Sequence, residues 1–202
     1  MPTAWLSCRA MRDSWRQIVL AAAALCVCAC GQQTTQAPQA ASGCALSATQ
    51  HVTWSNAETP DTITTRADGP ACARAVVSFT VLDARGNSVW RFNSTYHDMT
   101  VGGAAPADAP AVSPEQAARF LASWTNVTVQ TSDRLPEWRD GAAEIVGQGG
   151  LRYSTALTRE RYEAMRHGNL RMICYAAAVD TTQCLVIDPT SNSPTMIAAY
   201  GP

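Results

Sequence analysis

The sequence contains no lysine: all 15 of its basic residues are arginine. Sixteen acidic residues oppose them, leaving a formal net charge of −1, and the arginines form no long basic run. Domains that bind nucleic acid present a clustered positive patch to the phosphate backbone. The charge pattern therefore argues against nucleic acid as a partner.

Motifs of catalysis and metal binding are also lacking. The G-x-S-x-G motif of serine hydrolases and the H-E-x-x-H motif of zinc enzymes are both absent. Of the three histidines, only His97 has a chemically interesting neighbour, Asp98, and we treat this pair as a speculative polar site. Adjacent residues of a strand point to opposite faces, which favours a polar turn over a reactive pair. The sequence thus predicts no catalytic residue, no metal and no cofactor.

The apolar runs are short. The longest is Ile18 to Ala29, which as a helix spans about 18 Å, against roughly 30 Å for the hydrocarbon core of a bilayer. Arg9, Arg12 and Arg16 precede it. A basic segment followed by a short apolar segment is typical of an export signal. We therefore predict that residues 1–29 are a signal peptide.

The end of this run, Val27-Cys28-Ala29-Cys30, resembles the lipobox of bacterial lipoproteins. The resemblance implies that Cys30 carries the lipid anchor, with more than one acyl chain, which makes anchoring stable. It also implies release to the outer membrane, facing the periplasm, because Gly31 rather than Asp follows the anchor. An ordinary cleaved signal peptide is the alternative.

The mature chain divides into two parts. Residues 30–43 hold the anchor and a Gln, Thr and Ala tract without charge or aromatic residues, which predicts a flexible tether. Residues 44–202 form a single disulfide-containing globular domain by length; at about 160 residues it buries roughly 70% of its unfolded surface. The sequence leaves open whether Met1 or Met11 is the start.

The eight cysteines support export. Three lie in the predicted signal and one is the predicted anchor, which leaves Cys44, Cys72, Cys174 and Cys184. An even number in an exported domain predicts two disulfides. We favour the pairs 44–72 and 174–184, because each pair flanks one local antiparallel unit. A zinc site is disfavoured, since structural zinc sites use closely spaced cysteine pairs.

Strands are predicted from alternating apolar residues. The clearest signal is a hairpin of residues 75–82 and 89–96, joined by a loop in which Gly86 suits a position with positive φ. Other segments read as strands are 46–54, 61–66, 170–179, 184–187 and 195–200.

Two helices are predicted. Residues 114–124 follow the capping box Ser113–Gln116, and a weaker helix spans 159–167, where Arg159 and Glu163 are spaced to form an ion pair. Strands and helices are segregated rather than alternating. The predicted fold is therefore α+β: an antiparallel sheet of about six strands with both helices packed on one face.

These features predict a lipid-anchored envelope protein with a non-catalytic binding or structural domain, which engages another envelope protein or a small ligand. One alternative is an inhibitor of an envelope hydrolase such as lysozyme, which rests on analogy alone. A second is a hydrolase built on carboxylates, for which Asp133, Glu137, Asp140 and Glu144 cluster in sequence. Charged loop residues of this kind are usually solvated.

Overall fold

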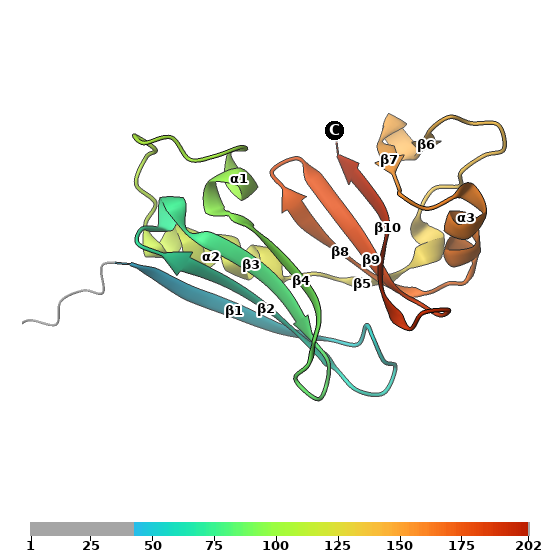
Figure 1. Cartoon of the computed structure of the whole chain (residues 1–202), viewed down its shortest axis with the longest axis horizontal. Coiled ribbons are helices and arrows are strands. Elements are labelled where there is room, and N and C mark those ends of the chain that lie inside the picture. Colours follow the sequence, from blue (N-terminus) through green and yellow to red (C-terminus); the bar gives the residue numbers. More distant parts are fainter. Residues whose placement is uncertain (1–42, 202) are drawn as a thin grey trace, which may run out of the picture. The chain divides into compact units, whose positions relative to one another are not determined.

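The computed structural model describes residues 43–201. The predicted signal peptide, the anchor Cys30 and nearly all of the tether lie outside the described residues. The described part has an α+β fold built on antiparallel strands, as predicted (Figure 1). Within it, no helix combines the length and apolar character needed to cross a membrane.

The first sheet, sheet A, has four antiparallel strands in sequence order. They are β1 (Cys44–Val52), β2 (Asp61–Gly69), β3 (Val76–Leu82) and β4 (Ser88–Thr95). The predicted β3–β4 hairpin is confirmed, and its loop contains Gly86 at φ 84°. Val77, Phe79 and Val81 alternate with more exposed residues and bury one face of the sheet.

The second sheet, sheet B, has six strands in the order β5-β8-β9-β10-β7-β6. Their bounds are β5 (Val129–Thr131), β6 (Ile145–Val146), β7 (Arg152–Ser154), β8 (Arg171–Ala178), β9 (Thr181–Asp188) and β10 (Ser193–Gly201). The described residues thus hold more strands than predicted, in two sheets rather than one. Strands as short as β6 and β7 show no readable alternation.

Three α-helices and three short 3-10 turns complete the described elements. The helices are α1 (Tyr96–Thr100), α2 (Pro114–Thr125) and α3 (Arg159–His167). The 3-10 turns are η1 (Cys72–Arg74), η2 (Ser132–Arg134) and η3 (Gln148–Gly150). The predicted capping box at the start of α2 is present: Ser113 Oγ accepts from the Gln116 amide, and Gln116 Oε1 accepts from the Ser113 amide.

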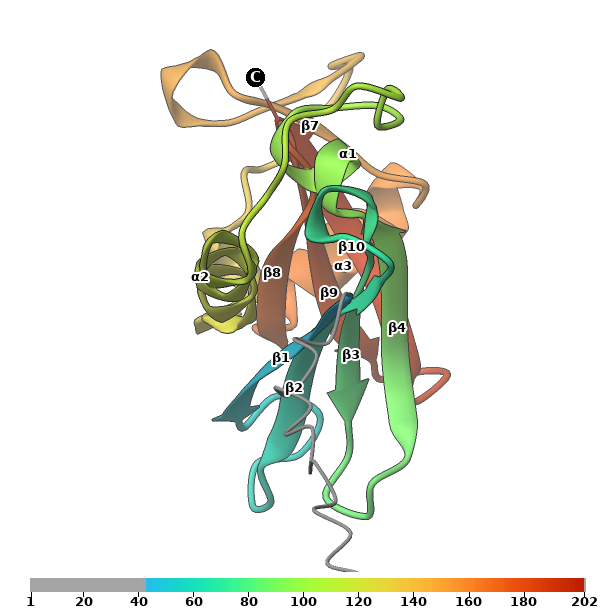
Figure 2. The ribbon, with the colours of Figure 1, turned by 90° about the vertical axis from the view of Figure 1, so that its left-hand side faces the viewer.

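A first core lies between sheet A, α2 and one face of sheet B (Figure 2). Its centre is aromatic: the ring of Phe79 stacks on that of Tyr175 at 4.6 Å and lies 5.7 Å from that of Trp124. Trp124 also donates from Nε1 to the carbonyl of Ala176 in β8, which ties α2 to sheet B. These contacts connect β3, α2 and β8 into one packed unit.

A second core lies on the opposite face of sheet B, under α3. Tyr162 and Met165 of α3 are buried there against Met172, Val186 and Ile197 of the sheet. The two helices therefore belong to different cores, whereas the sequence predicted both on one face. The reason is that sheet B is covered on both faces, so each helix has an apolar surface of its own to cover.

Both predicted disulfides are present in the structure. Cys44 and Cys72 are bonded with 4.8 Å between their Cα atoms, and Cys174 and Cys184 with 4.1 Å. The first pair belongs to the first core. The second joins directly opposed residues of β8 and β9 and belongs to the second core. Each core therefore contains one of the two disulfides.

Candidate functional site

The speculative polar pair His97 and Asp98 lies in α1, not in a strand: β4 ends at Thr95 and α1 begins at Tyr96. Asp98 accepts hydrogen bonds from the amide of Gly103 and from the hydroxyl of Ser94, both at 2.8 Å. His97 Nδ1 lies 3.1 Å from the carbonyl oxygen of Gly103. Both side chains thus hold the turn that follows α1, which is a structural use of the pair.

Of the four clustered carboxylates, Asp133, Glu137, Asp140 and Glu144, all but Glu137 have a separate partner within the described residues. Asp140 pairs with Arg159 at 2.9 Å, and Glu144 pairs with Arg152 at 3.0 Å. Asp133 accepts from Thr131 Oγ1 at 2.5 Å. Across residues 43–201, no three side chains of the metal-binding types gather around a common point.

The structure instead brings together an aromatic cleft, a cavity of about 540 Å³ whose walls include Trp138, Ile145, Tyr153 and Tyr200. Strand pairing explains the arrangement, because Tyr153 lies opposite Tyr200 in β10 and opposite Ile145 in β6. Directly opposed residues point to the same face of a sheet. The two tyrosine rings consequently lie 4.8 Å apart, inclined by 40°.

The rim of the aromatic cleft is polar. It includes Glu144, Arg152, Ser154 and Asp180. The Glu144–Arg152 pair is exposed at 54% and 74% of its side chains, so the pair adds little to stability and its groups stay accessible to a ligand. Partial burial raises the pKa of the Tyr153 phenol above its ordinary value of 10.0, with Tyr200 contributing.

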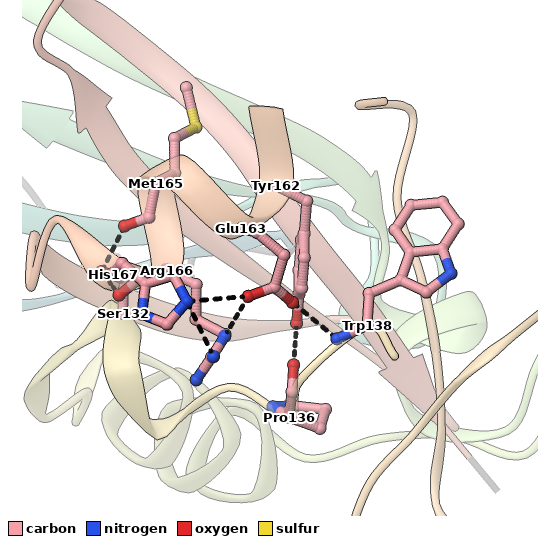
Figure 3. Close-up of polar contacts among 8 residues, drawn as sticks. All are labelled: Ser132, Pro136, Trp138, Tyr162, Glu163, Met165, Arg166 and His167. Atoms are coloured by element: carbon pink, nitrogen blue, oxygen red, sulfur yellow. Dashed lines mark hydrogen bonds and ion pairs between the residues drawn. The ribbon is translucent and has the colours of Figure 1, made fainter. Parts of the chain in front are cut away.

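Trp138 is held in the cleft wall by α3. Its backbone amide donates to Glu163 Oε1 at 2.6 Å, and its ring lies edge-on to Tyr162 with the ring centres 6.1 Å apart (Figure 3). Its indole Nε1 donates to the carbonyl of Ala142 at 3.0 Å. Tyr162 in turn donates from its hydroxyl to the carbonyl of Pro136 at 2.6 Å. The loop that carries Pro136 and Trp138 is thereby hydrogen-bonded to α3 at both residues.

Glu163 is the centre of this network. Its Oε2 accepts from Arg166 Nε at 2.8 Å and lies 3.3 Å from His167 Nε2. Burial opposes its ionisation, but the hydrogen bonds from Trp138 and Arg166 outweigh burial and lower the pKa of the Glu163 carboxyl. The predicted Arg159–Glu163 pair was wrong, because Glu163 turns toward Trp138 and Arg166.

The aromatic cleft was not predicted from the sequence. Its tyrosines come from strands distant in sequence, and one of these strands has only three residues. The one local signal is Trp138 itself, a large aromatic residue in a mostly polar loop. No protein-family model matches the chain, and no curated protein or solved structure matches it significantly.

Proposed function

We propose that this chain is a lipid-anchored outer-membrane protein whose domain faces the periplasm and binds a ligand, without catalysis, in the aromatic cleft. The lipobox-like segment ending at Cys30 supports the anchor. The two disulfides support an oxidising compartment, since such bonds persist outside the cytoplasm.

The aromatic cleft is the observation that carries the binding role. Its volume of about 540 Å³ lies within the usual range for small-ligand sites. Tyr153 and Tyr200 are half-buried: they pack against the second core and also line the cavity. The rim supplies carboxylate, guanidinium and hydroxyl groups. This combination suits a ligand with a flat apolar face and a hydrogen-bonding edge, such as a saccharide unit.

The binding role is tested with the purified lipidated protein in detergent. We expect Tyr200→Ala to weaken binding of soluble envelope oligosaccharides about tenfold in calorimetric titrations. The reason is that the stacking of a flat ligand face on an aromatic ring contributes a binding free energy that corresponds to about this factor. Tyr96→Ala is the matched control, since this tyrosine packs on Phe120 in the other core. Equal affinities of both variants and the unsubstituted protein would remove the cleft from the proposal.

A second experiment addresses the partner. Affinity purification from solubilised outer membrane, with Tyr200→Ala as the comparison, identifies proteins whose retention requires the cleft. Retention of a lysozyme with loss of its activity would favour the hydrolase-inhibitor alternative over a glycan-binding role.

The anchor is tested by replacing cysteines. We expect Cys30→Ser to abolish lipid labelling and to leave unprocessed precursor. Cys28→Ser is the matched control and keeps labelling, because serine is also a small residue at that position of the lipobox-like segment. Labelling that survives Cys30→Ser would move the anchor to another cysteine.

A further inference from the structure

A second cavity, of about 600 Å³, lies between the chain after β1 and the edge strand β5. We call it the basic groove. Its polar lining consists of Arg134, Arg171, Gln130 and the hydroxyls of Thr53, Thr128 and Thr131. The one remaining lining residue is apolar, and the lining includes no carboxylate.

The two arginines are brought together by strand pairing and by a buried serine. Arg171 lies opposite Thr131 in the β5–β8 pair, and Arg134 ends the turn η2 that directly follows β5. Ser132, fully buried, donates from Oγ to the carbonyl of Met165 at 2.8 Å, as Figure 3 shows. The same oxygen accepts from the Leu170 amide at 2.8 Å. Ser132 thus fixes both the turn that carries Arg134 and the residue before Arg171.

Within residues 43–201, neither arginine of the basic groove forms an ion pair, and the carboxylate next to Arg134 in the chain, Asp133, accepts from the hydroxyl of Thr131. The arginine ion pairs of this part of the chain use four other arginines. Both arginines are exposed, so their charges remain available to an anion that enters the groove.

We propose that the basic groove binds a phosphate group. Guanidinium groups pair with phosphate through two parallel hydrogen bonds, which is the strongest geometry available to arginine. Two guanidinium groups together with the hydroxyls of Thr53 and Thr128 offer more donors than the two oxygens of a carboxylate can accept. A phosphate, with more acceptor oxygens, uses this donor set more completely. The phosphate belongs either to a lipid headgroup or to a soluble molecule.

The test uses the lipidated protein in nonionic detergent, titrated with inorganic phosphate and, separately, with a short-chain, water-soluble phosphatidic acid. We expect saturable binding that weakens about tenfold in Arg134→Gln and in Arg171→Gln, since a hydrogen bond to a charged group is worth this much. Tighter binding of phosphatidic acid than of phosphate identifies a headgroup as the source. Equal binding of the two identifies a soluble phosphate.

The matched control is Arg119→Gln, which removes an exposed arginine of α2 that lines neither cavity. We expect its phosphate affinity to be unchanged, and the circular dichroism of all three variants to match the unsubstituted protein. Failure of both titrants to bind, or an equal loss in the control variant, would overturn the proposal. Tyr200→Ala separates the two proposals, because it removes a wall of the aromatic cleft and leaves the basic groove intact.

Discussion

The two faces of sheet B are stabilised in different ways. On the face toward sheet A, large side chains such as Phe79, Tyr175 and Leu121 fill a continuous core. On the face toward α3, the core is smaller and depends on hydrogen bonds between side chains and backbone, made by Ser132, Tyr162 and others. The first core holds the molecule together by burial, whereas the second also forms walls of the aromatic cleft.

This comparison predicts large and similar losses from truncating either core. We expect Phe79→Ala to lower the free energy of unfolding by about 3–5 kcal/mol and Met165→Ala by about 2–5 kcal/mol, because each leaves a cavity. Urea unfolding followed by circular dichroism measures both. Since the cores share sheet B, a single cooperative transition is expected in each variant. Two separate transitions would show that the cores unfold independently.

The two disulfides close chain loops of different length, one in each core. Their cysteines are 28 and 10 residues apart. Loop entropy then predicts losses of about 3.6 kcal/mol for Cys44→Ala with Cys72→Ala and about 2.7 kcal/mol for Cys174→Ala with Cys184→Ala. Thermal unfolding of the two double variants measures the order. A larger loss in the second core would mean that packing around the opposed pair, not loop closure, dominates.

Glu163 gives the second core a pH dependence. We expect Glu163→Gln to cost about 1–3 kcal/mol near neutral pH, because the Trp138 amide and Arg166 lose a charged acceptor.

The sign of this pH dependence follows from the lowered pKa of Glu163. Its ionised form is favoured by folding, so its contribution is complete above the ordinary value of 4.5 and is lost as pH falls through the lower folded pKa. The gap between the unsubstituted protein and Glu163→Gln should therefore close in acid. Denaturant titrations across this range measure the gap, and a constant difference would assign the loss to packing instead.

The smallest expected difference in stability between the two cores comes from the N-cap residues of their helices. Ser113→Ala, at the start of α2, is expected to cost about 1 kcal/mol, and Thr158→Ala, at the start of α3, somewhat less. The reason is that Ser113 belongs to a reciprocal capping box, whereas Thr158 Oγ1 accepts one bond from the Arg161 amide at 3.3 Å. Thermal unfolding of both variants measures the difference, and a larger effect at Thr158 would contradict it.

Much of the first core was predictable because its signals are local. The alternation of apolar and polar residues predicts the hairpin of β3 and β4, and the capping box predicts the start of α2. Helix α3 and the 174–184 disulfide were predicted too, but the long-range contacts of the second core were not, for the opposite reason. Ser132, Glu163 and Trp138 act through contacts with backbone groups that are distant in sequence, and no local pattern encodes those partners. The same holds for the pairing of Tyr153 with Tyr200.

The sequence by itself therefore determined the α+β class and the approximate positions of the main helices and strands, and it favoured the two disulfide pairs that are present, since each depends on short-range periodicity, caps or cysteine spacing. Only the tertiary structure decided that the strands form two sheets and that the helices cover different cores. It also decided that tyrosines gather in one cleft and arginines in another. The physical reason is that strand order and register bring side chains together across the sheet, and neither is encoded in any single segment.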